Sequence, residues 1–164
     1  MAIITLNNNS LSSVTALPAG VGGKVLQVVT GVTYTQTSMA SATYTDTTLT
    51  ASITPSATSN KILIIVNQFF RKDTSNAYIG YKLLRNSTEL NYIGDIITYT
   101  ANTNSNGNGI GTTYLDSPST TSSITYKTQF ATLNGGTVTV NADSSSDTER
   151  GRGSMTLMEI AGWL

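Results

Sequence analysis

The sequence predicts an all-β protein: an antiparallel β-sandwich, jelly-roll-like head preceded by a short N-terminal arm. Ser, Thr and Asn together fill more than a third of the 164 residues, and there are 14 Gly, a composition typical of strands and turns. About ten short segments rich in Val, Ile, Thr and Tyr follow one another at close spacing, as in a sandwich. No segment shows the 3.6-residue apolar period of an amphipathic helix.

Residues 1–23 are interpreted as the arm. Its apolar side chains recur through an otherwise polar segment, and a hinge-like stretch of Pro and Gly follows at 18–23. Too few of these residues are apolar to form a core, so we expect the arm to become ordered on a partner; the alternative is a frayed terminus. The predicted attachment residues are Ile3, Ile4, Leu6, Leu11, Val14 and Leu17.

Residues 24–164 are interpreted as one head domain, a usual domain size. The expected strands are 25–34, 42–53, 61–70, 77–84, 89–93, 95–100, 110–115, 124–132, 137–140 and 154–161. The apolar residues at successive positions of 61–70 predict a central strand covered on both faces. A hairpin is expected around 85–88, and Asn134-Gly135-Gly136 predicts a tight turn because such turns need φ > 0.

Charge and composition exclude several function classes. Nine basic and nine acidic residues cancel, so no basic footprint for nucleic acid exists. The longest apolar run, 62–66, is far shorter than the ~20 residues of a membrane-spanning helix, so no membrane insertion is predicted. Without His or Cys, the chain lacks the commonest acid–base group and any thiolate. No catalytic residue, metal site or cofactor is predicted.

A family resemblance rests on four segments in order. They read Gly-Lys-Val-Leu-Gln-Val at 23–28, Ile-Thr-Pro-Ser-Ala-Thr-Ser-Asn-Lys-Ile-Leu-Ile at 53–64, Leu-Asp-Ser-Pro at 115–118 and Met-Thr-Leu-Met-Glu-Ile-Ala-Gly at 155–162. Together they resemble the head domain of tail-fibre-like virion surface proteins of aquatic bacteriophages, of the cyanophage type. The resemblance implies a small β-sandwich that assembles as a homotrimer on the particle.

Three functions stay open at this point. The leading hypothesis is a non-enzymatic virion structural protein, mounted by its arm and acting as a tail-fibre-type host-surface-binding protein. The alternative is a capsid decoration (cement) protein that stabilises the phage head. The third is a tailspike-type glycan hydrolase, which would need two of the nine acids to face each other. The expected partners are further copies of the chain, tail, baseplate or major capsid proteins, and a host-surface glycan. The expected location is the particle surface, after synthesis in the host cytoplasm.

Candidate recognition residues lie around a polar, Asn-rich stretch at 101–109. Amide groups both donate and accept hydrogen bonds, which suits sugar hydroxyls, although a plain strand connection has the same composition. Two guanidinium groups follow an acidic stretch at 143–149, which lacks the ligand pattern of a calcium-binding EF-hand. The candidates are Tyr92, Tyr99, Asn102, Asn104, Asn106, Asn108, Arg150 and Arg152.

Overall fold

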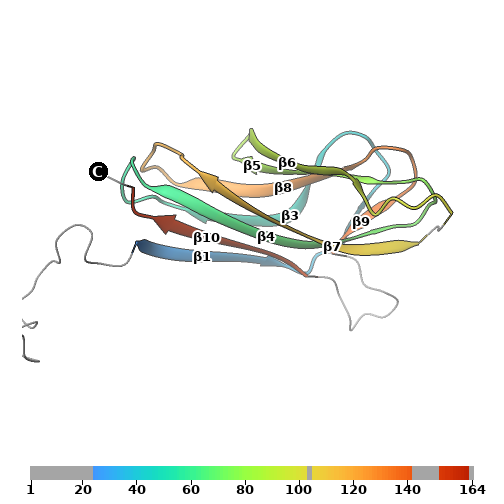
Figure 1. Cartoon of the computed structure of the whole chain (residues 1–164), viewed down its shortest axis with the longest axis horizontal. Helices are drawn as coiled ribbons and strands as arrows, with labels where there is room; N and C mark the ends of the chain where they lie inside the picture. Colours follow the sequence, from blue (N-terminus) through green and yellow to red (C-terminus); the bar gives the residue numbers. More distant parts are fainter. Residues whose placement is uncertain (1–23, 103–104, 142–151, 163–164) are drawn as a thin grey trace, which may run out of the picture.

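A computed structural model describes residues 24–102, 105–141 and 152–162 (Figure 1). These residues form ten strands and no helix, so none of them forms a helix able to cross a membrane. The strands are β1 (Val25–Thr33), β2 (Thr37–Met39), β3 (Thr45–Ile53), β4 (Lys61–Lys72), β5 (Ile79–Arg85), β6 (Thr88–Ile97), β7 (Asn106–Asp116), β8 (Ile124–Thr132), β9 (Val138–Val140) and β10 (Gly153–Ile160). The predicted all-β class is confirmed.

The strands form two antiparallel sheets that pack as a sandwich. Sheet A has the order β1-β10-β4-β9-β2, with β7 paired to the other side of β4. Sheet B has the order β3-β8-β5-β6. In Figure 1, sheet A lies in front of sheet B, and the start of β1 and the end of β10 are at the same end of the elongated molecule.

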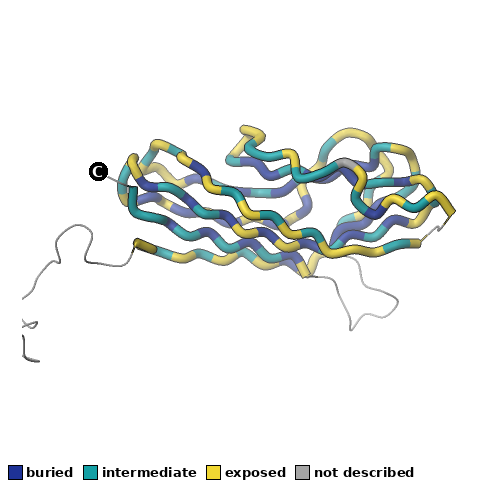
Figure 2. Tube along the Cα trace, viewed as in Figure 1, coloured by how far each residue is buried: buried dark blue, intermediate teal, exposed yellow. Residues whose placement is uncertain are grey.

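The core lies between the sheets because apolar residues alternate along the strands that face it. From sheet A, β4 buries Ile62, Ile64, Val66 and Phe70, while β8 of sheet B buries Tyr126 and Phe130. Figure 2 shows this alternation as dark and light segments along the same strands. The Phe70 ring also packs edge-on against Tyr81, with centroids 4.7 Å apart. Successive side chains on a strand point to opposite faces, so each strand contributes one face to the core.

A polar row crosses this core at Gln68 of β4. Its Oε1 accepts hydrogen bonds from the Tyr81 hydroxyl at 2.7 Å and from Thr128 Oγ1 at 3.0 Å. Its Nε2 donates to Asn141 Oδ1 at 3.1 Å. Burial raises the pKa of Tyr81, so its hydroxyl remains a donor. Because buried polar groups are costly without partners, this row restricts which strands can face one another.

Several sequence expectations hold in detail. β4 is central, with β10 and β9 on one side and β7 on the other. β5 and β6 form the expected hairpin, with Arg85 opposite Thr88 and Asn86 at φ 52° between them. Gly135 and Gly136 have φ of 73° and 72°, as the predicted turn requires. However, β8 and β9, which this turn connects, belong to different sheets.

Other expectations are wrong. The short strand β2 was not predicted, and the segments 89–93 and 95–100 are mostly one continuous strand, β6. The structure also contradicts the prediction that β4 is covered on both faces. Ile62 and Ile64 are fully buried, whereas Ile65, directly after Ile64, is 37% exposed. Successive apolar residues of this strand therefore face the core and the outer face of sheet A in alternation.

We predict that Ile64→Ala lowers the free energy of unfolding by about 2–5 kcal/mol, because the deletion leaves a cavity between the sheets. Ile96→Ala on β6 is the matched control: the same atoms are removed from a side chain that is 66% exposed. We expect a loss below about 1 kcal/mol for the control. Urea titration measures both, and equal losses would contradict the packing described here.

Candidate recognition site

The Asn-rich stretch lies at the end of the sandwich opposite the start of β1 (Figure 1). Here β6 ends, and β7 begins with Asn106. Tyr99 and Asn102 are exposed in the connection, and Asn108 is exposed on β7. The candidates Asn104 and Arg150 and the six predicted attachment residues of the arm lie outside the described residues.

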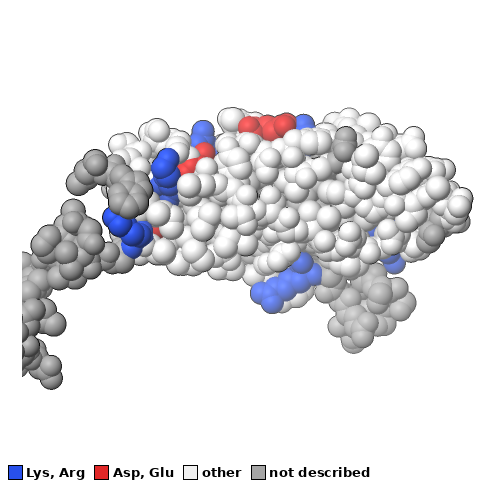
Figure 3. Space-filling view, in the orientation of Figure 1, with Lys and Arg blue, Asp and Glu red and all other residues white. Residues whose placement is uncertain are grey.

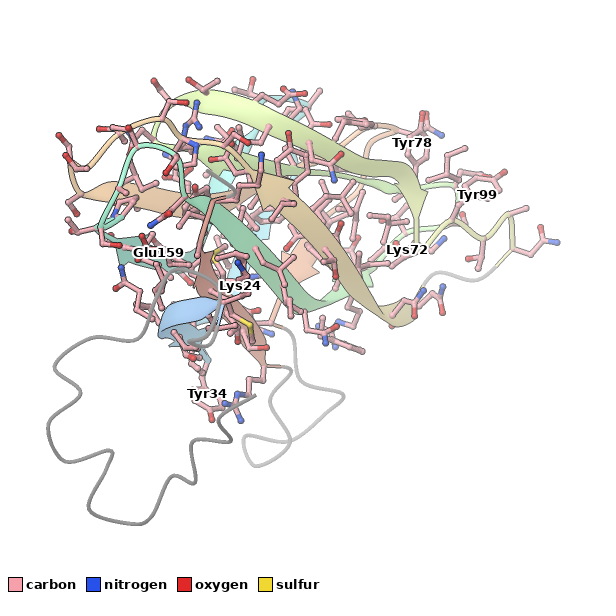
Figure 4. All side chains as sticks on the ribbon, turned by 60° about the vertical axis from the view of Figure 1, so that its left-hand side comes forward. Lys24, Tyr34, Lys72, Tyr78, Tyr99 and Glu159 are labelled. Atoms are coloured by element: carbon pink, nitrogen blue, oxygen red, sulfur yellow. The ribbon has the colours of Figure 1, made fainter. Side chains whose placement is uncertain are left out.

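A group of side chains surrounds Tyr99, and we call it the tip cluster: Lys72, Asn76, Tyr78, Tyr99 and Asn106. The rings of Tyr99 and Tyr78 pack edge to face with centroids 6.3 Å apart. The Tyr99 hydroxyl lies 3.4 Å from Asn76 Oδ1, to which it donates. Tyr99 nevertheless remains 46% exposed. Figure 4 shows Tyr99, Tyr78 and Lys72 together at one end of the molecule.

Lys72, the last residue of β4, holds the other members of the tip cluster in place. Its side chain is buried, and its Nζ donates a 2.9 Å hydrogen bond to the Thr100 carbonyl oxygen. The same nitrogen lies 5.9 Å from the centroid of the Tyr99 ring, within the range of a cation–π contact. The end of β4 thus fixes the segment that carries Tyr99.

Backbone strain marks the start of this segment. Thr98 has φ 67°, a conformation that is strained for a β-branched residue. Its carbonyl oxygen accepts a 3.2 Å hydrogen bond from Asn106 Nδ2. Its hydroxyl oxygen is the only buried side-chain polar atom without a hydrogen bond within the described part of the chain. Such strain is often found at ligand-binding sites.

The other candidates lie elsewhere. Tyr92 is on the outer face of sheet B, where the Tyr44 hydroxyl donates to the Tyr92 hydroxyl at 3.1 Å. Lys82 Nζ lies 4.1 Å from the Tyr44 ring centroid and forms a 2.7 Å ion pair with Glu89. Arg152 lies over the Tyr34 ring at 5.8 Å, and Figure 4 shows Tyr34 well apart from Tyr99. The predicted residues therefore do not form one site.

Sequence reasoning missed Lys72, Asn76 and Tyr78 as neighbours of Tyr99. They are more than 20 residues away along the chain. The fold brings these segments together through the pairing of Ile79 with Ile97 between β5 and β6 and through hydrogen bonds from Lys72 and from the Asn76 amide to the Thr100 carbonyl oxygen. The one local signal was the hairpin at 85–88, whose two strands extend to this end.

Asp46 and Asp116 are held separately, each by its own partners. Asp46 pairs with Lys127 at 2.9 Å and accepts from Gln129 at 2.8 Å. Burial opposes the ionised form of Asp46, but these two hydrogen bonds outweigh it and lower the pKa. Asp116 accepts from both Arg85 and the Tyr126 hydroxyl. Within the described ranges, no three acids gather as metal ligands would.

Glu159 has the most completely satisfied carboxylate. The residue is only 1% exposed. Its Oε1 accepts from Ser56 N at 2.6 Å, Ser56 Oγ at 2.8 Å and Asn60 Nδ2 at 2.6 Å, and its Oε2 accepts from Gln27 Nε2 at 2.6 Å. Burial alone would raise its pKa, but the hydrogen bonds from Asn60, Gln27 and Ser56 outweigh that effect, so the pKa is lowered. These four hydrogen bonds all come from uncharged donors, which suits a structural anion.

The four segments of the resemblance now have physical roles. Gln27, Ser56 with Asn60, and Glu159 come from three of them and meet at one carboxylate. The Gly162 amide extends this group by donating to Asn60 Oδ1 at 3.0 Å. The fourth segment supplies Asp116, which holds Arg85 and Tyr126 at the same end of the sheets. These segments stabilise the fold and lie away from the tip cluster.

Comparison with known proteins adds a limited likeness. No protein-family model matches the chain, and no curated protein matches it. Among solved structures, T=1 particles derived from infectious bursal virus have a TM-score of 0.47 at 13% identity, over 83% of this chain and 36% of that one. The T13 viral particle of the same virus has a TM-score of 0.47 at 12% identity, over 85% and 36%. Its VP2 subviral particle has a TM-score of 0.44 at 12% identity, over 83% and 37%. The chain thus spans little more than a third of those chains.

We predict that Glu159→Gln lowers the free energy of unfolding by about 2–3 kcal/mol near neutral pH, because a charged acceptor of several hydrogen bonds is lost. Since the folded pKa is lowered, the stabilisation is complete above the ordinary Glu value of about 4.3 and disappears as pH falls through the folded pKa. The difference between wild type and variant should therefore narrow on acidification. Denaturant titrations from pH 7 to pH 3 measure it.

Glu89→Gln is the control for this substitution. Glu89 forms an ion pair with Lys82 on the surface, and its side chain is 46% exposed. We expect its replacement to change stability by less than about 1 kcal/mol. A difference between wild type and Glu159→Gln that stays constant with pH would show that packing, and not charge, explains the loss.

Proposed function

We propose that this protein is a non-enzymatic structural protein of a bacteriophage particle, a homotrimeric head that binds the host surface in the manner of a tail fibre. The observation that carries the proposal is the position of two regions at opposite ends of the sandwich. The N-terminal segment joins the head at the start of β1, and the tip cluster lies at the far end (Figure 1). A head mounted at one end presents the other end outward.

The sequence resemblance supports the virion assignment, and the structure gives its segments a consistent role. Three of the four segments meet around Glu159 at the end that carries the N-terminal segment. A mounted head must transmit force from its attachment to its body. The buried Glu159 carboxylate accepts four hydrogen bonds and so links β1, β10 and the β3–β4 connection, which can then resist such a force together.

The chemistry of the tip cluster favours a glycan as the recognised group. A half-exposed Tyr ring offers a flat apolar face and a polar edge, and Tyr99 is held in place by Tyr78 and Asn76. The neighbouring Asn102 supplies an exposed amide that can both donate to and accept from sugar hydroxyls. A pre-positioned aromatic ring loses little conformational entropy on binding.

The non-enzymatic part of the proposal is supported by how the acids are used. Asp46, Asp116 and Glu159 each hold structural donors of different strands. Hydrolysis of a glycan needs two carboxyl groups about 5–9.5 Å apart across the scissile bond. The chain has no His to replace one of them.

The alternative within the same class is a capsid decoration protein. Both roles use an attached β-sandwich, and copy number separates them. A few tens of copies or fewer at the tail support the fibre-type role. Hundreds of copies over the capsid would support the decoration role instead. Quantitative mass spectrometry of purified particles, with the major capsid protein as the internal standard, measures the ratio.

We predict that deleting residues 1–17 leaves a folded, trimeric head that no longer incorporates into particles. The deletion removes Ile3, Ile4, Leu6, Leu11, Val14 and Leu17 and leaves the Gly-rich stretch and every strand in place. Particles lacking the protein are incubated with full-length or truncated chain, and occupancy is measured after purification. Normal occupancy of the truncated chain would show that the head makes the mounting contacts itself.

We also predict that Tyr99→Ala weakens binding of the purified protein to host envelope polysaccharide about tenfold, which corresponds to ~1.4 kcal/mol. Tyr92→Ala is the matched control, since Tyr92 is 43% exposed on the outer face of sheet B. Binding is measured on immobilised polysaccharide. A loss confined to the Tyr92 variant would place recognition on sheet B and contradict the tip assignment.

A further inference from the structure

The outer face of sheet A carries a continuous row of apolar side chains. Paired residues in an antiparallel sheet point to the same side. Val28 of β1 is opposite Met158 of β10, which is opposite Leu63 of β4, which is opposite Leu115 of β7. Met158 and Leu63 alternate with the buried Leu157, Glu159, Ile62 and Ile64, so this row points away from the core.

Exposure is highest at the ends of the row, because Met158 and Leu63 in its middle are half-buried. Val28 is 55% exposed and Leu115 is 52% exposed, and they lie at its two ends. Val25 opposite Ile160, and Ile65 one row further along β4, extend the apolar area. Four strands about 4.8 Å apart and about eight residues of about 3.3 Å each outline roughly 500 Å² of sheet face. The apolar row crosses this area, and the row that contains Ile65 carries Thr in the other three strands. A contiguous exposed apolar patch on a soluble protein often marks an interaction site.

Charge distinguishes this face from the opposite one. The only acids in β1, β4, β7 and β10 are Asp116 and Glu159, and both are buried. In Figure 3 the broad front of the molecule is almost free of charged side chains, which gather at its ends and edges. The outer face of sheet B instead carries the ion pairs Lys127–Asp46 and Lys82–Glu89. Only one outer face therefore resembles the centre of an interface, where charge is depleted.

We propose that the outer face of sheet A is the surface through which copies of this chain pack against one another. The inference rests on the homotrimer of the proposed function and specifies the surface that forms it. Lys61 and Arg71 point to this face only at the two ends of β4, so its centre is uncharged and can pack against a second copy, and a chain of zero net charge has no overall repulsion to overcome. The area of roughly 500 Å² fits the central part of an interface that takes about 800 Å² from each partner.

The position of the N-terminal segment favours a second copy as the occupant. Residues 1–23 enter the head at β1, the edge strand of this same face. Copies packed through the face would bring their N-terminal segments to a common end. Those segments contain no Asp, Glu, Lys or Arg, so gathering them brings no charge repulsion. One oligomer could then be mounted at one place on a particle.

The test is the mass of the full-length chain in solution across a hundredfold range of concentration, measured by sedimentation. Wild type is expected to be oligomeric, with a thermal midpoint that falls on dilution. The double variant Val28→Asp, Leu115→Asp places a charge at each end of the row and should weaken association at least a hundredfold. Ile96→Asp is the control: it places the same charge on a more exposed apolar residue of sheet B, and its mass should match wild type. Circular dichroism establishes that each variant is folded.

Three results would overturn the inference. The first is a wild-type chain that stays monomeric throughout. The second is a double variant that associates as tightly as Ile96→Asp. The third is a full-length monomer that becomes oligomeric when residues 1–17 are deleted, since the chain's own N-terminal segment would then be the occupant. A dimer dissociated by the double variant would support the face while contradicting the trimer, and failed incorporation into particles alone would affect only the proposed function.

Discussion

The hydrogen bonds accepted by the Glu159 carboxylate are the interaction on which the arrangement of the chain most depends. A buried carboxylate is costly unless its oxygens accept several hydrogen bonds. The donors to Glu159 come from β1 and from the β3–β4 connection. Asn60 in that connection also accepts a hydrogen bond from the segment after β10. The first and last strands of the described head are therefore neighbours in sheet A for a specific electrostatic reason. Backbone pairing alone would allow β1 to slip; Gln27 opposite Glu159 fixes its register.

β4 connects this end to the rest of the molecule. It begins beside the Glu159 group and ends with Lys72 at the tip cluster. On one side it pairs first with β10 and then with β9, and on the other it pairs with β7 along almost its whole length. Midway along it, Gln68 joins the two sheets through Tyr81 and Thr128. Its apolar residues serve the core on one side and the outer face of sheet A on the other. One strand thus connects the Glu159 group, the core, the proposed subunit interface and the tip cluster.

The sequence was sufficient to predict the fold class, most strands and the β5–β6 hairpin, because alternation and turn residues are local signals. It was insufficient for sheet membership: Asn134-Gly135-Gly136 makes the expected turn, yet the flanking strands go to different sheets. The run at 62–66 shows a second reason. Apolar residues at successive positions do not distinguish a buried second face from an exposed apolar one. The candidate site was predicted only in part. Tyr99 packs against Tyr78 and Tyr92 packs against Tyr44, and only the fold brings each of these two pairs together.

The Glu159 group and the tip cluster lie far apart, so substitutions affect the two ends of the sandwich differently. Substitutions in an exposed connection cost little as long as its ends stay in place, because loop closure depends weakly on loop length. Lys72 and the Ile79–Ile97 pair hold the ends of the tip segment, so its exposed residues can vary without disturbing the core. At the other end, replacing Gln27, Ser56 or Asn60 leaves a buried charge with fewer donors. The fold therefore permits the proposed binding surface to diversify at one end while the geometry of the other end is maintained, which is what the proposed function requires.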